Sequence, residues 1–133
     1  MISVQQFQAF AEQGYKRIPV VHDVLSDLDT PLSAYLKLAG GACSYLFESV
    51  EGGARWGRYS IIGLPARTVL KVYGYRLVLE ENGEIVRDEI VKDPLAEIEK
   101  IKMAISVPRM PDLPKFHGGW VGYFGYECAQ YIE

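Results

Sequence analysis

The sequence is poor in the residues that build metal sites and disulfide frameworks. Its 133 residues include two cysteines, Cys43 and Cys128, and two histidines, His22 and His117, each isolated from the others. Zinc sites need clustered ligands, and disulfide-stapled domains need several paired cysteines. Both cysteines lie in apolar runs, so we expect buried free thiols, which suit a reducing cytoplasm.

The chain also lacks a basic excess and a long hydrophobic run. It has 14 Lys and Arg against 17 Asp and Glu, a net charge of −3. Nucleic acids and anionic membranes attract basic surfaces, so the charge predicts neither partner. The start, MISVQQFQAF, lacks the basic and apolar regions of a signal peptide, and no stretch approaches the roughly 18 apolar residues of a membrane span. We therefore expect a cytoplasmic protein.

Common catalytic signatures are missing as well. The sequence contains no GxSxG, P-loop, HExxH or CxxC pattern. The glycines at 118, 119, 122 and 125 follow neither a phosphate-loop nor a dinucleotide pattern, and they indicate a bend or a close backbone approach within a sheet. Taken alone, these residues do not predict a complete enzyme.

The composition, with 49% hydrophobic and 23% charged residues, is that of one globular domain. Three helices are predicted from capping residues and apolar spacing. They are residues 3–13, with Ser3 as the cap, residues 31–39, capped by Thr30, and residues 94–105, capped by Asp93.

Runs of β-branched and aromatic residues predict strands, and residues 17–25 are also expected to be extended. The predicted strands are residues 43–50, 58–64, 68–73, 75–81, 84–90 and 118–127, the last broken by glycines. Residues 43–50 carry apolar side chains on both alternating faces, so we expect them to be covered on both sides. Asn82-Gly83 predicts a type I′ hairpin. These elements indicate an α+β fold with a mainly antiparallel sheet flanked by helices. Residues 128–133 resemble the first turn of another helix, so we interpret the chain as a fragment.

Glu48 and Ser49 end the otherwise apolar strand 43–50. One interpretation is that the strand simply emerges into a polar loop. The other is a ligand pocket, in which Glu48 accepts a hydrogen bond from a ligand ammonium and Ser49 bonds a ligand polar atom. Adjacent side chains of a strand point to opposite faces. Both residues therefore serve one pocket only at a strand end or bulge, or if one acts through its backbone.

The segment 51–60 contains two glycines and two arginines that flank Trp56. It could be a hairpin loop with a cation stacked on the indole. Alternatively, it could cover a small anionic or zwitterionic ligand, with Arg58 as the cation.

Three blocks of the sequence resemble the N-terminal region of anthranilate synthase component 1, in the same order and with similar separations. They are TPLSAYLKL (30–38), SYLFESVEGGARWGRYSIIG (44–63) and FHGGWVGYFGYECAQYIE (116–133). The LFES segment corresponds to the family's LLES motif, with Phe47 in place of the second leucine.

This resemblance implies residues 1–133 are the N-terminal regulatory domain of a lyase of tryptophan biosynthesis. The family makes anthranilate and pyruvate from chorismate, requires Mg²⁺, and receives ammonia from a glutamine amidotransferase subunit, component 2. Tryptophan inhibits it, and the inhibitor site is carried over to Glu48, Ser49 and, less directly, Arg58. The family's catalytic and metal-binding residues lie in its C-terminal half. No catalytic or metal residue is therefore expected here, and this fragment alone should be inactive.

Two alternative functions remain open. The large component of aminodeoxychorismate synthase, in folate synthesis, shares the fold, but its motif around residues 51–60 is usually less close. A free-standing amino-acid-binding regulatory module is the third hypothesis, and the interrupted helix at residues 128–133 argues against it.

Overall fold

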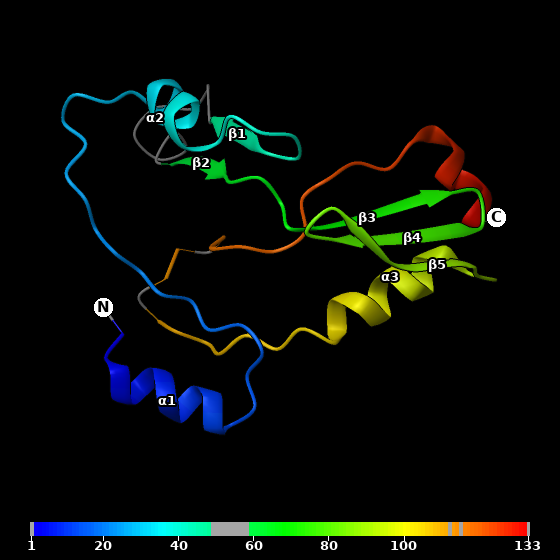
Figure 1. The fold of residues 1–133 in the computed structure, drawn as a ribbon, viewed down its shortest axis with the longest axis horizontal. Coiled ribbons are helices and arrows are strands. Elements are labelled where there is room, and N and C mark those ends of the chain that lie inside the picture. The colour runs from blue at the N-terminus through cyan, green and yellow to red at the C-terminus, as the bar shows by residue number, and fades with distance from the viewer. Residues whose placement is uncertain (1, 49–58, 112, 115, 133) are drawn as a thin grey trace. The chain divides into compact units, whose positions relative to one another are not determined.

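The computed structural model describes residues 2–48, 59–111, 113–114 and 116–132 (Figure 1). By its internal contacts the chain divides into two compact units. Unit 1 consists of Met1–Asp23 and Val91–Glu133, and unit 2 consists of Val24–Ile90, so unit 2 is inserted into the sequence of unit 1. Helices and antiparallel sheets confirm the predicted α+β class.

The larger sheet of unit 2 has three antiparallel strands in the order β3-β4-β5. They are β3 (Thr68–Tyr73), β4 (Arg76–Glu81) and β5 (Glu84–Ile90). The central strand contributes two buried side chains, Leu77 and Val78. Because adjacent residues of a strand point to opposite faces, these two side chains lie on the two different faces of the sheet.

The connection from β4 to β5 is the predicted two-residue hairpin. Asn82 and Gly83 have φ values of +52° and +85°. Both central positions of a type I′ turn require positive φ, so the prediction is confirmed. At the other end of β4, the Arg76 guanidinium donates two hydrogen bonds to Asp88 on β5, at 2.7 and 2.6 Å.

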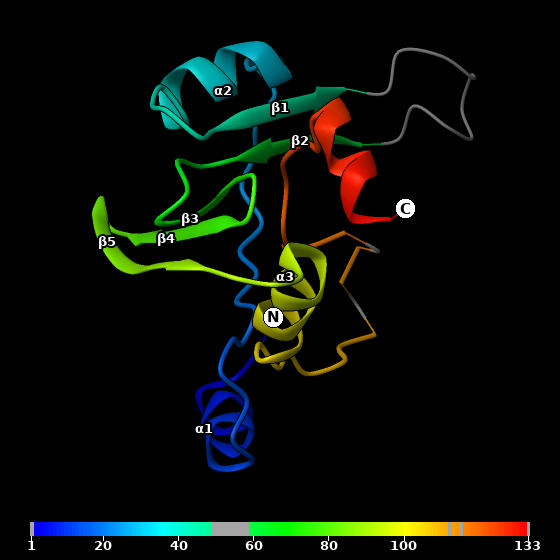
Figure 2. The same cartoon turned by 90° about the vertical axis from the view of Figure 1, so that its right-hand side faces the viewer.

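The second sheet of unit 2 is an antiparallel pair, β1 (Tyr45–Glu48) and β2 (Ser60–Gly63). Helix α2 (Pro31–Leu38) lies beside this pair, as Figure 2 shows. The predicted burial of β1 on both sides is wrong, since Tyr45 and Leu46 are half-buried and Phe47 is 50% exposed. Two strands and one short helix supply too little surface to cover both faces.

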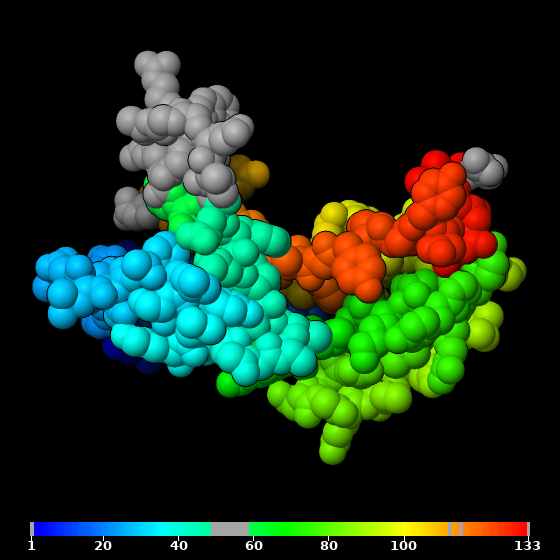
Figure 3. Space-filling model, turned by 90° about the horizontal axis from the view of Figure 1, so that it is seen from above, coloured from blue at the N-terminus to red at the C-terminus, as the bar shows by residue number. Residues whose placement is uncertain are grey.

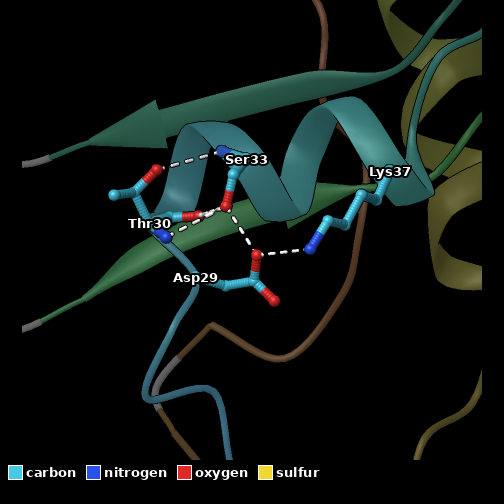
Figure 4. A network of polar contacts seen from close by, with 4 residues as sticks. All are labelled: Asp29, Thr30, Ser33 and Lys37. Carbon is cyan, nitrogen blue, oxygen red and sulfur yellow. Dashed lines mark hydrogen bonds and ion pairs between the residues drawn. The ribbon is translucent and has the colours of Figure 1, made fainter.

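Helix α2 begins with a network of polar contacts (Figure 4). Thr30 and Ser33 form a capping box, in which each side chain accepts a hydrogen bond from the other residue's backbone N–H. The Ser33 hydroxyl and the Lys37 ammonium both donate to Asp29 Oδ1, at 2.7 and 2.6 Å. These hydrogen bonds, that from Lys37 above all, lower the pKa of Asp29 from its ordinary value of 3.8. Leu32, Leu36 and Leu38 of α2 are exposed, and Figure 3 shows part of this helix at the surface of unit 2.

Unit 1 contains the other two predicted α-helices. Helix α1 (Val4–Glu12) begins with a capping box between Ser3 and Gln6, and α3 (Pro94–Met103) is capped by Asp93. Residues 17–25, expected to be extended, form no strand. The Arg17 N–H instead donates a single hydrogen bond to the Ser106 carbonyl at 3.2 Å.

The predicted strand over residues 118–127 is wrong. Its first part has no regular secondary structure, and a 3₁₀ helix, η2 (Tyr126–Tyr131), follows. Gly118 and Gly119 have φ values of +136° and +145°, which no strand adopts. The short helix predicted near residues 128–133 is thus present but begins earlier and is 3₁₀.

The cysteines are free, as predicted, but the prediction that both are buried is wrong. Cys43 is exposed and Cys128 is half-buried. Cys43 precedes β1 in a turn, with φ of +57°, so it does not share the burial of the strand that follows.

Replacing Gly83 with Val should destabilise the protein by roughly 1 kcal/mol or more, because a β-branched residue disfavours positive φ. Urea unfolding of both proteins measures the difference. Gly83→Asn is the matched control, since asparagine tolerates this conformation and should cost less. Equal losses for Val and Asn would show that the turn does not require positive φ at this position.

The lowered pKa of Asp29 predicts a stability contribution that depends on pH. A carboxyl whose pKa is lower in the folded state stabilises the fold above its unfolded pKa, and the contribution disappears as pH falls through the folded pKa. Asp29→Asn should therefore lower Tm at pH 7, and the difference should shrink as pH falls below about 3.8. Thermal unfolding at several pH values tests this, with Asp27→Asn as the control for charge. A Tm difference that stays constant down to acid pH would contradict the assignment.

Candidate functional site

The candidate site is built on the end of β1. Tyr45, Leu46 and Phe47 favour a strand because aromatic and apolar residues pack well on a pleated surface. β1 pairs with β2 in a register that places Glu48 directly opposite Ser60. Leu46 and its partner Ile62 form another pair two positions back, so they share a face with Glu48 and Ser60.

Helix α2 holds the beginning of β1 through a short chain of hydrogen bonds. The Tyr35 hydroxyl on α2 lies 2.9 Å from the Ser44 hydroxyl, just before the strand. The Ser44 hydroxyl in turn donates to the Gly41 carbonyl at 2.7 Å. These hydrogen bonds hold the start of β1, next to Ser44, and Glu48 lies at the other end of the strand.

The Glu48 side chain is exposed. Among the residues that the structure describes, no hydrogen bond or ion pair is made by its carboxylate. An ionised carboxylate only accepts hydrogen bonds and offers about four acceptor positions. Glu48 is therefore able to accept hydrogen bonds from an ammonium or hydroxyl group of a ligand.

The other two predicted site residues, Ser49 and Arg58, lie outside the described residues, as does Trp56. The structure thus places one of the three predicted residues. Glu48 is the last described residue before this gap, so the pocket hypothesis and the simpler interpretation, a strand that emerges into a polar loop, both stay predictions.

Ser60 is a neighbour of the site that the sequence did not single out. It begins β2, is exposed, and pairs with Glu48 across the two strands. Its hydroxyl both donates and accepts hydrogen bonds, so it complements a carboxylate that only accepts. No local sequence signal marks Ser60, because it becomes a neighbour of Glu48 only through the pairing of β1 with β2.

Neither a cluster of metal-ligand side chains nor a helix able to span a membrane is present in the described part of the chain. There, no group of three or more His, Cys, Asp or Glu side chains is arranged to hold a metal ion. Within the same residues, no helix has the length and apolar character needed to cross a membrane.

Comparison with known proteins shows what this chain is similar to. It is 52% identical over 129 residues to anthranilate synthase component 1 of Pseudomonas putida, a match that covers 97% of the chain. The chain is homologous to part of anthranilate synthase component 1. The resemblance carried by the three sequence blocks is thereby confirmed.

Other component 1 proteins match along the whole chain. That of Neisseria gonorrhoeae is 53% identical over 133 residues, and that of Acinetobacter calcoaceticus is 43% identical over 136 residues; each match covers 100% of this chain. The chain spans about a quarter of the length of these component 1 proteins, 26% for Pseudomonas putida and 27% for the other two. No family model and no solved structure matches the chain.

Proposed function

We propose that this chain is the N-terminal, tryptophan-binding regulatory domain of an anthranilate synthase component 1. The complete lyase converts chorismate and ammonia to anthranilate and pyruvate in tryptophan biosynthesis. Identity of 52–54% to component 1 proteins over nearly the whole chain is the observation that carries this proposal. We further propose a glutamine amidotransferase, component 2, as the partner that supplies ammonia.

The proposed cofactor of the complete enzyme is Mg²⁺. The residues that this structure describes do not fit a magnesium site, because no cluster of acidic ligands is present among them. The metal and chorismate therefore belong, in this proposal, to the portion of the relatives that this chain does not span. The chain's own contribution is regulation.

The proposed inhibitor site recognises tryptophan by the opposite charges of its amino acid group. Glu48 accepts hydrogen bonds from the ligand ammonium, Ser49 bonds a ligand polar atom, and Arg58 binds the ligand carboxylate. Hydrogen bonds between ionised groups are about twice as strong as neutral ones. The exposed Glu48 carboxylate at the end of β1, with the Ser60 hydroxyl opposite, supports this assignment.

Inhibition through such a site requires that tryptophan binds the inactive state of the enzyme more tightly than the active state. Loss of the site should then abolish the response to tryptophan and leave catalysis without tryptophan nearly unchanged. This separation is the property that distinguishes a regulatory residue from a catalytic one.

The two alternative functions gain no support. The relatives named above are all called anthranilate synthase component 1, and none is called a folate enzyme or a free-standing binding module. Identification of the product that the complete protein forms from chorismate separates anthranilate synthase from aminodeoxychorismate synthase.

The isolated chain should not convert chorismate, because its described residues contain no cluster of metal-binding carboxylates. Chorismate, Mg²⁺ and ammonium are incubated with the chain, and anthranilate is followed by its fluorescence. Component 1 of Pseudomonas putida serves as the positive control. Steady anthranilate formation in proportion to the concentration of the chain would refute the regulatory assignment.

Ser49→Phe and Glu48→Ala should desensitise the complete enzyme to tryptophan. The test uses a chimera in which this chain replaces the homologous quarter of Pseudomonas putida component 1. A lost hydrogen bond typically costs about 0.5–1.5 kcal/mol, and the phenylalanine ring also fills the space of the ligand. Since about 1.4 kcal/mol is tenfold in affinity, the inhibition constant should rise about tenfold or more in Ser49→Phe.

The kinetic measurements are kcat, KM for chorismate and the inhibition constant for tryptophan. Glu84→Ala, an exposed glutamate at the start of β5, is the matched control and should leave all three unchanged. An unchanged inhibition constant in both site variants would overturn the site, and a collapse of kcat with inhibition retained would assign these residues to the fold or to catalysis.

A further inference from the structure

The Tyr45 ring lies flat across the backbone of β2 at Gly63, its partner in the register. A Cβ atom built on Gly63 would overlap three ring atoms of Tyr45: Cδ1, Cε1 and Cζ. The same ring packs against Phe47 two positions along β1, with ring centroids 4.8 Å apart and the planes tilted by 33°. The space that any other residue at position 63 would fill is therefore occupied by an aromatic ring from the neighbouring strand.

The remaining pairs of β1 and β2 do not select one register. Leu46 faces Ile62 and Phe47 faces Ile61, and a shift by one residue would still bring Leu46 opposite Ile61. Short hairpin loops can set the register by their turn type, but residues 49–58 between these two strands lie outside the described residues.

Gly63 favours the observed register. A shift of β1 by one or two residues in either direction would bring Tyr45 opposite Ile62, Leu64, Ile61 or Pro65. Each of these has a side chain where Gly63 has none, so the ring could not keep its present position over the backbone of β2. Aromatic residues paired with glycine across two strands are a known device for fixing the register of a sheet.

The register decides where Glu48 points. Because side chains alternate between the faces of a strand, a slip of one residue moves every side chain of β1 to the other face relative to β2. Glu48 would then leave the face it shares with Ser60.

We propose that Tyr45 and Gly63 act as a register lock, and that they are positioning residues for the ligand site at Glu48. The part of this proposal that concerns the ligand rests on the proposed function. The part that concerns the register does not.

The first measurement is independent of any ligand. Cross-strand nuclear Overhauser effects between Glu48 and Ser60 are recorded on the isotopically labelled chain, and resonances of β3 to β5 report whether unit 2 remains folded. Gly63→Ala and Tyr45→Val should reduce the population of the observed register relative to slipped forms by about tenfold, which corresponds to roughly 1.4 kcal/mol. Tyr45→Phe keeps the ring and should retain the register.

Two controls separate the lock from general damage to the fold. Gly122→Ala is the matched glycine control, because a Cβ there meets nothing within 4 Å, and it should change no cross-strand signal. In the Tyr45→Val background, Gly63→Ala should add little further loss, since the ring that it displaces is already gone. Retention of the Glu48–Ser60 signal in both Gly63→Ala and Tyr45→Val, or its loss in Tyr45→Phe, would overturn the proposal.

The second measurement titrates L-tryptophan and follows the amide shifts of Glu48 and Ser60. Gly63→Ala should weaken binding about tenfold while Tyr45→Phe leaves it unchanged. Normal affinity in a variant whose register has slipped would refute the positioning role. If tryptophan causes no amide shift changes in the parent chain, or the same changes in Glu48→Ala, the proposed tryptophan site is refuted. The register lock is then judged by the first measurement alone.

Discussion

Backbone pairing between antiparallel strands holds each of the two sheets of unit 2 together, and few side chains of the described chain are fully buried. Ala39, Leu77 and Val78 are the buried hydrophobic residues of the described part of the chain. Strand β4 contributes two of them and pairs on both sides, with β3 and with β5. The register of each strand pair is therefore important, since it determines the face of the sheet on which every side chain lies.

Local signals made several elements predictable from the sequence. Ser3, Thr30 and Asp93 each cap the helix that was expected to follow them, because a short polar side chain satisfies a free backbone N–H of the first turn. Asn82 and Gly83 likewise specify their turn through conformations that few other residues adopt. In all these cases the residue that specifies the structure and the residue it interacts with are only a few positions apart in the sequence.

Predictions failed where structure depends on a distant partner. Residues 118–127 have the composition of a strand, but within the described chain no strand pairs with them, and composition alone does not provide one. Cys43 was expected to be buried because apolar residues surround it in sequence. It lies in a turn before the strand, where the thiol is exposed although apolar residues follow it in sequence.

The candidate site combines both kinds of information. Glu48 could be singled out from the sequence because a charged residue ends an apolar run, which is a local pattern. Ser60 could not, because it becomes a neighbour of Glu48 only through the pairing of β1 with β2. The small size of Gly63 has meaning only beside the Tyr45 ring. In the proposed register lock, a small residue on one strand thus affects the position of a candidate binding residue on another, because its missing side chain leaves room for the Tyr45 ring.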